Sequence, residues 1–246
     1  MDKSIQARRK AQKLAREEKI PAAIEEMSRL LAEAETDPYD HVYLGDLLLR
    51  DRRAPEAIDA WMQAVQAYER AGLNRNAIAT CKKILRLDQH RVPVHRTLGD
   101  LYYQEGLMGE AVPHFLQYLD SVSPDDKFSE EFLETLERAT SVVGLQIEAA
   151  LRLADHYLRI KQEDRAAQLL RQIAEKVIAA GGAAEAVEAL RLRAEEAEEA
   201  SRSRLAPLEA AGPELPTVDP ASLDATSLSF DAVPASRGDG PASLAA

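Results

Sequence analysis

The sequence predicts an all-α protein built from stacked helix pairs. Apolar residues recur with a helical period of 3.6 from about Lys3 to Arg204, and no segment alternates like a strand for long. Much of the 46% apolar content is alanine and leucine, which together with glutamate, arginine and lysine favour helices. The Leu-Gly-Asp-Leu segment at 44–47 occurs again at 98–101, which indicates a repeated structural element.

The helical periodicity divides the chain at turn-forming residues. We expect helices at 3–18, 22–35, 39–52, 55–71, 74–88, 92–105, 109–121, 126–142, 146–161, 164–180 and 184–203. Prolines near the first turn support several starts, because a missing N–H costs little there: Pro21, Pro38, Pro55, Pro93 and Pro124. Glycines that suit a left-handed cap fall at the breaks: Gly72, Gly106, Gly144 and the pair Gly181–Gly182. Pro113 lies just inside its helix and should forfeit one early hydrogen bond.

An alanine near the start of several helices marks an internal repeat. The aligned positions are Ala23, Ala57, Ala77, Ala111, Ala167 and Ala186, so the successive spacings are 34, 20, 34, 56 and 19 residues. A spacing of 34 is the tetratricopeptide repeat (TPR) period. The segment 97–119 also resembles the TPR family through Leu98-Gly99, Tyr102, Gly106, Ala111 and Phe115.

The resemblance implies a right-handed α-solenoid of TPR-like helix pairs over roughly residues 20–200. We divide the chain into a basic N-terminal helix (1–19), TPR units (20–121), degenerate TPR-like units (122–204) and a disordered acidic tail (205–246) that is rich in proline, serine and alanine. Small residues such as Gly99 let two helices approach closely, and Phe115 fills the remaining space. The spacing from Gly45 to Gly99 is 54, or 34 + 20, which we explain by one helix shared between two pairs. Segment 122–144 is either an extra helix or a degenerate unit.

Composition excludes several classes of function. The net charge is −11, and the basic excess is confined to residues 1–19, with seven Lys/Arg against three Asp/Glu. An acidic body lacks the basic footprint that nucleic acid requires. The first twenty residues lack an apolar signal-peptide core, and no run of eighteen apolar residues could span a bilayer. We therefore expect a cytoplasmic protein, with the N-terminal helix solvated or capping rather than bound to a membrane.

Catalytic and ligand-binding patterns are not evident. The five histidines form no metal-binding motif, and no glycine-rich nucleotide-binding loop occurs. Cys81 occupies a position where the repeat needs a mid-sized apolar side chain, so we expect a core thiol rather than a nucleophile. We expect no catalytic residue, cofactor, metal or small-molecule substrate, and hence no enzyme.

The TPR resemblance implies a concave groove lined by the first helix of each pair. The positions in register are Tyr39, Val42, Asp46 and Leu49, then Arg96, Asp100 and Tyr103, then Arg152, His156 and Arg159. Asp46 and Asp100 replace the asparagine of TPR domains that clamp a peptide carboxylate, and they would repel that group. We expect a groove that grades from acidic and apolar residues towards Arg and His.

These observations favour a non-catalytic scaffold or adaptor that binds a peptide or helix of a partner protein, possibly within a larger assembly. The alternative is a secretion-type chaperone or co-chaperone that holds an apolar segment of a client. The tail adds a candidate docking motif among acidic and serine residues, formed by Leu223, Leu228, Phe230 and Val233. The sequence does not predict the oligomeric state.

Overall fold

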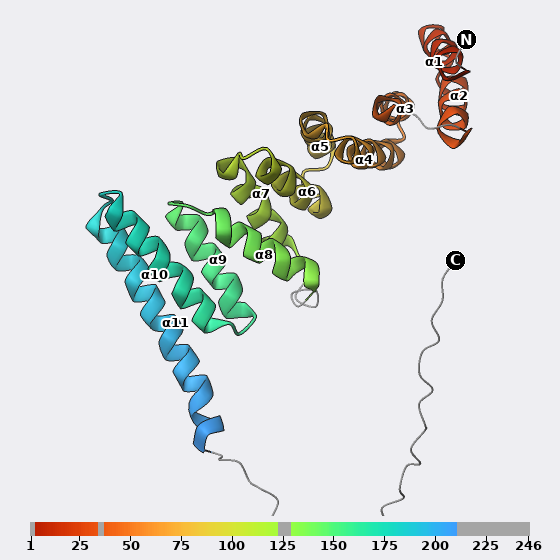
Figure 1. Cartoon of the computed structure of the whole chain (residues 1–246). Helices are drawn as coiled ribbons and strands as arrows, with labels where there is room; N and C mark the ends of the chain where they lie inside the picture. The colour runs from red at the N-terminus through yellow and green to blue at the C-terminus, as the bar shows by residue number, and fades with distance from the viewer. Residues whose placement is uncertain (1–2, 34–36, 123–128, 211–246) are drawn as a thin grey trace, which may run out of the picture. The chain divides into compact units, whose positions relative to one another are not determined.

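The structure is a computed structural model that describes residues 3–33, 37–122 and 129–210. All regular secondary structure in these ranges is helical (Figure 1). The eleven helices of the described ranges are α1 (Lys3–Arg16), α2 (Ile20–Glu33), α3 (Pro38–Arg50), α4 (Ala54–Arg70), α5 (Asn74–Leu87), α6 (Val92–Gln104), α7 (Met108–Ser121), α8 (Glu130–Val142), α9 (Ile147–Arg159), α10 (Glu163–Ala179) and α11 (Ala184–Ala210).

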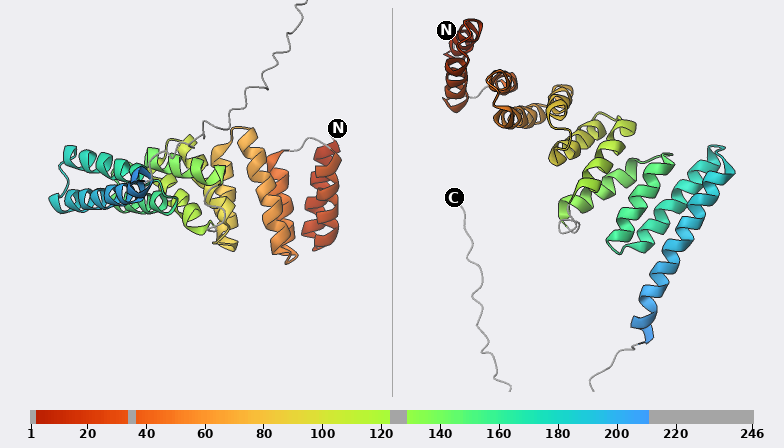
Figure 2. Two further views of the ribbon diagram at one scale, coloured as in Figure 1. Left: turned by 90° about the horizontal axis from the view of Figure 1, so that it is seen from below. Right: turned by 180° about the vertical axis from the view of Figure 1, so that it is seen from behind.

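Consecutive helices pack against each other, as a stack of hairpins requires. The most extensive contacts join α3 with α4, α6 with α7, α4 with α5, α1 with α2, and α9 with α10. Helix α4 packs against both α3 and α5, which is the shared helix that the spacing of 54 predicts. The two views of Figure 2 agree in placing α10 and α11 side by side. The predicted all-α solenoid of TPR-like helix pairs is confirmed.

The described residues up to Ser203 form one compact unit. Helix α8 begins after Ser129, whose side chain accepts a hydrogen bond from the Phe132 backbone N–H at 3.2 Å; the predicted start at 126 lies outside the described residues. Helix α11 continues to Ala210, beyond the predicted helix end at 203.

Several connections between helices contain a residue with positive φ. Gly72, Gly106, Gly144 and Gly181 have φ values of 68°, 74°, 59° and 70°, as their positions at the breaks predict. Three further connections use Glu18, Arg52 and Lys161 in the same conformation, which the sequence does not signal. The residue after Arg52 closes the turn, because the Arg53 N–H donates to the Leu48 carbonyl at 2.9 Å.

The buried side chains show that the helix pairs are also related by a longer repeat of three helices. Along the third helix of each repeat, Ala77, Phe132 and Val187 are buried at intervals of 55 residues, and so are Ile84, Ala139 and Ala194. The repeats are therefore α3–α5, α6–α8 and α9–α11. Helix α8 is the third helix of the second repeat. It lies within segment 122–144, for which the sequence predicts either an extra helix or a degenerate unit.

The same register corrects the alignment of α10. Ala166 is fully buried and lies 55 residues after Ala111, whereas the sequence alignment used Ala167. The aligned Ala186 is only partly buried. Ala166 and Ala167 are adjacent and both buried, so an alignment on one alanine does not distinguish between the two positions.

Helices α1 and α2 correspond to the second and third helices of a three-helix repeat. The buried residues Ala23, Ile24, Met27 and Leu30 of α2 precede Ala77, Ile78, Cys81 and Ile84 of α5 by 54 positions. Arg8 of α1 donates two hydrogen bonds of 2.7 Å to Asp40 of α3, which is 2% exposed. The basic N-terminal helix is thus docked onto the helical array.

Candidate partner-binding face

The predicted groove residues lie on the first helices of the three repeats, α3, α6 and α9. Tyr39, Leu49 and Tyr103 are exposed, with relative exposures of 58%, 38% and 40%. Val42, Asp46, Arg96 and Asp100 are partly buried, whereas Arg152 and Arg159 are exposed. The solvent-facing side of α3 and α6 therefore carries an apolar or aromatic residue close to a partly buried aspartate.

Each of these two helices approaches the second helix of its repeat through a glycine. A Cβ atom added to Gly45 would overlap the Trp61 ring, and one added to Gly99 would overlap the Phe115 ring. Trp61 and Phe115 are almost completely buried. The paired glycine and aromatic residue thus fix the depth at which α3 and α6 lie against α4 and α7.

The close approach also positions Asp46. The indole N–H of Trp61 donates to the Asp46 carboxylate at 3.1 Å and lies 3.2 Å from the Val42 carbonyl. Lys83 of α5 forms an ion pair with the same carboxylate, and its ammonium lies 4.7 Å from the centroid of the Trp61 ring. Asp46 is therefore bound by groups from α4 and α5.

The aspartate–cation bridge occurs in all three repeats. Asp46 of α3 pairs with Lys83 of α5, and Asp100 of α6 pairs with Arg138 of α8. In the third repeat, Asp155 of α9 accepts from Arg193 of α11 at 2.7 Å. The first and third helices of each repeat are thus bridged at equivalent positions, and the carboxylate charge is compensated inside the repeat.

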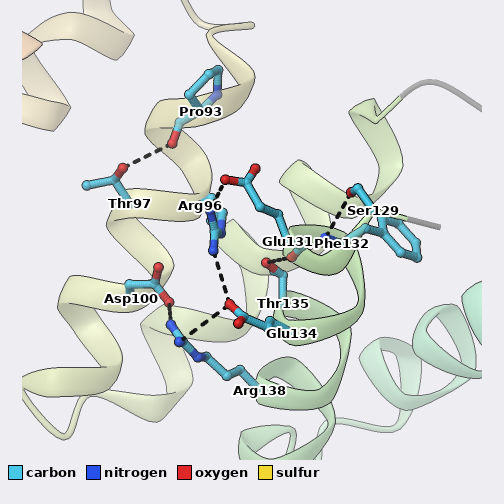
Figure 3. A network of polar contacts seen from close by, with 10 residues as sticks. All are labelled: Pro93, Arg96, Thr97, Asp100, Ser129, Glu131, Phe132, Glu134, Thr135 and Arg138. Carbon is cyan, nitrogen blue, oxygen red and sulfur yellow. Dashed lines mark hydrogen bonds and ion pairs between the residues drawn. The ribbon is translucent and has the colours of Figure 1, made fainter. Parts of the chain in front are cut away.

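The second repeat extends this bridge into a network between α6 and α8 (Figure 3). Arg96 lies 3.0 Å from the Glu131 carboxylate and 3.4 Å from that of Glu134. Arg138 contacts Glu134 at 3.9 Å in addition to Asp100. The charged groove candidates Arg96 and Asp100 are therefore engaged with α8.

The prediction for α9 is wrong for His156. This side chain is 2% exposed, because His156 occupies the place of the core residues Leu47 and Leu101. Its Nε2 lies 2.9 Å from the Asp120 carboxylate of α7, and its ring meets Phe132 edge-on at a centroid distance of 5.9 Å. Burial lowers the pKa of His156, and the hydrogen bond to Asp120 opposes that shift.

Arg152 and Arg159 also lie one position away from the face that the sequence assigned to them. In the observed register, the α9 residues equivalent to Arg96, Asp100 and Tyr103 are Leu151, Asp155 and Leu158. Arg152 forms an ion pair with Asp120. The expected gradient towards exposed Arg and His therefore does not hold for α9, whose equivalent face is Leu, Asp and Leu.

The candidates on the three helices contact different neighbouring helices. Those of α3 meet α4 and α5, those of α6 meet α8, and His156 and Arg152 meet α7. The bridging residues Lys83, Arg138 and Arg193 were missed by sequence reasoning. Their constant spacing of 55 was the available signal, but it has meaning only once the three-helix register is known.

Chemical groups elsewhere in the described chain fit a structural role. Burial raises the pKa of the Cys81 thiol to about 12, with a smaller contribution from Glu69, so the reactive thiolate is scarce at neutral pH. Among the described residues, no group of three or more His, Cys, Asp or Glu side chains could hold a metal ion, and no helix combines the length and apolar character needed to cross a membrane. The tail candidates Leu223, Leu228, Phe230 and Val233 lie outside the described residues.

No protein-family model matches the chain, and no match was found among curated proteins. Solved structures with similar helix arrangements include MamA, with 17% identity over 56% of this chain and 96% of that chain and a TM-score of 0.25. BtubC from P. vanneervenii has 15% identity over 80% of this chain and 89% of its own, with a TM-score of 0.33. A thermophilic TPR protein of Thermus thermophilus has 20% identity over 79% and 98% of the two chains, with a TM-score of 0.23. With TM-scores this low, the description of the fold rests on the packing of the chain's own helices.

Proposed function

We propose that the chain is a non-catalytic scaffold or adaptor that binds a peptide or helix of a partner protein in a groove lined by the solvent-facing sides of its first helices. The observation that carries this proposal is the composition of these faces. Leu49 and Tyr103 occupy equivalent exposed positions, while the neighbouring Asp46 and Asp100 are compensated by Lys83 and Arg138. Exposed apolar and aromatic side chains beside neutralised charges suit apolar anchors of a partner rather than a terminal carboxylate.

The experiment compares proteins captured by the full chain and by variants. The double variant Leu49→Ser with Tyr103→Ser removes the proposed anchors, and Leu73→Ser is the matched control, because Leu73 is 46% exposed in the α4–α5 connection. We expect partners identified by mass spectrometry to be lost with the double variant and retained with the control. Retention of the same partners by the double variant would reject the proposed face. A truncation after Ala210 tests the tail motif separately.

The alternative is a secretion-type chaperone or co-chaperone for an apolar segment of a client. Tyr39 and Leu49 are exposed at opposite ends of α3, at 58% and 38%, and two exposed apolar side chains on one helix favour contact with such a segment. The two functions differ in the behaviour of the captured partner. A client should aggregate or be degraded when it is produced without this chain, whereas a partner of a scaffold should fold alone.

A further inference from the structure

Two histidine rings meet at the junction of the first and second three-helix repeats. His95 of α6 is buried, and His114 of α7 is partly buried. Their Nδ1 atoms are 3.2 Å apart, and the ring centroids are 5.5 Å apart. The Nε2 atom of His95 lies 3.0 Å from the backbone carbonyl of Gln89 in the α5–α6 connection. One contact therefore ties together α6, α7 and the chain segment that enters from the first repeat.

The hydrogen-bond partners determine which nitrogen carries a proton. A carbonyl oxygen only accepts, so the Nε2 of His95 donates to Gln89. In neutral His95 the Nδ1 then accepts, and the Nδ1–H of His114 is the donor between the rings. One additional proton on His114 leaves this bond intact. Protonation of both rings would set two N–H groups against each other at the same point.

The surroundings disfavour that second positive charge. In the described chain, the titratable or charged groups that face the pair are Tyr102 of α6 and Lys82 of α5. The Tyr102 ring stacks on His114 at a centroid distance of 5.6 Å and an interplanar angle of 8°, and the Lys82 ammonium lies 5.5 Å from the centroid of Tyr102. Burial lowers the pKa of His114 to about 4, and the positive charges of His95 and Lys82 act in the same direction.

We propose that His95 and His114 form an acid-sensitive latch that holds α6 and α7 to the α5–α6 connection and opens at low pH, because the open state takes up a proton that the closed pair disfavours. This inference goes beyond the proposed scaffold function and does not depend on it. A group whose pKa is lower in the closed state than in the open state stabilises the closed state at a pH above its open-state pKa. This stabilisation is lost as the pH falls towards the closed-state pKa. The window extends from about 6.5, the ordinary histidine pKa, down to about 4.

The test measures local opening of the full chain by amide hydrogen exchange between pH 7.5 and pH 5, with each rate corrected for intrinsic exchange. A single group with these two pKa values raises the opening constant roughly 30-fold at pH 5. We expect that increase in residues 89–95 and 111–118. His114→Gln should reduce the increase to less than about threefold, whereas the control His90→Gln should retain it, because exposed His90 lies in the same connection without contacting the pair.

A second variant protects the test against loss of folding. Leu169 of α10 occupies the place equivalent to His114 and is buried, so His114→Leu provides a side chain that this position accommodates in the third repeat. Exchange that becomes independent of pH in this variant supports the latch. An undiminished increase in both His114 variants, or no increase in the unmodified chain, would overturn it. Nuclear magnetic resonance of the histidine rings supplies a direct reading, since His114 should titrate well below the ordinary histidine pKa of about 6.5.

Discussion

Gly99 of α6 lies directly against the ring of Phe115 of α7, so closely that a Cβ atom at residue 99 would overlap the ring. Gly45 and Trp61 stand in the same relationship in the first repeat. In the third repeat the corresponding pair is Ala154 and Leu170, both buried. In the third repeat, alanine therefore takes the place of glycine, and leucine takes the place of the larger aromatic residue. The side chain at the first position is larger where its partner is smaller.

Gly99→Ala should destabilise the chain by about 1–3 kcal/mol, because the Phe115 ring must move within a packed core. Gly109→Ala is the control, since a Cβ there meets no atom within 4 Å and the backbone φ is not positive. That substitution should stabilise the helix by about 0.5 kcal/mol, because alanine loses less chain entropy on folding. Urea denaturation monitored by circular dichroism measures both changes. Equal effects of the two substitutions would contradict the close approach.

Asp100→Asn and Arg138→Gln should be coupled in a double-mutant cycle by about 0.5–1 kcal/mol, because their ion pair is partly exposed. The coupling should decrease when the salt concentration is raised to about 1 M, where the Debye length is about 3 Å. Asp155→Asn with Arg193→Gln tests the equivalent bridge of the third repeat and should give the same sign. Additive single-mutant effects in both repeats would show that the bridges contribute nothing to stability.

Arg8→Ala should destabilise the N-terminal part of the array by about 2–3 kcal/mol. The substitution leaves the carboxylate of Asp40 buried without its two charge-assisted hydrogen bonds, and the partial exposure of Arg8 keeps the cost below that of a fully buried pair. Arg9→Ala is the matched control, because Arg9 is the exposed neighbour on the same helix and should change stability by less than about 0.5 kcal/mol. Limited proteolysis should release α1 faster in the Arg8 variant only.

His156→Leu should weaken the pH dependence of stability. Because burial lowers the pKa of His156 in the folded state, the unfolded chain takes up a proton first as the pH falls below the ordinary value of about 6.5. Stability from the neutral ring is therefore present above that pH and is lost below it. Leucine occupies the equivalent core positions 47 and 101. Denaturation midpoints at pH 7.5 and pH 5 should differ less in the variant, and an unchanged difference would contradict this role.

Arg52→Gly should stabilise the α3–α4 connection by about 0.5–1 kcal/mol. Arg52 has a φ of 61°, which costs a residue with a Cβ about 1–2 kcal/mol, and the greater chain entropy of glycine offsets part of the gain. Gly106→Ala provides the opposite change at the equivalent turn of the next repeat, where φ is 74° and a Cβ has open space. It should cost about 1 kcal/mol. Thermal denaturation of both variants checks the two signs.

The candidate site was predictable in part. The exposed positions Tyr39, Leu49 and Tyr103 follow from the sequence, because one face of an amphipathic helix is set by local spacing. The burial of His156 does not follow, because a histidine is compatible with either environment. Its position depends on the register of α9 against α7, which a difference of one residue in a connection is enough to change.

The sequence by itself determined the eleven helices of the described ranges, most of their ends, the glycines with positive φ and the Gly–aromatic pairs, because these depend on periodicity and backbone conformation within a few residues. Only the tertiary structure decided that the repeat has three helices, that α8 is a third helix, and that Asp46, Asp100 and Asp155 meet cations 37 or 38 residues later. Such contacts depend on which faces of the first and third helices meet, and these two helices are separated by two connections. Small differences in connection length and core volume select among these arrangements, and they leave no local pattern in the sequence.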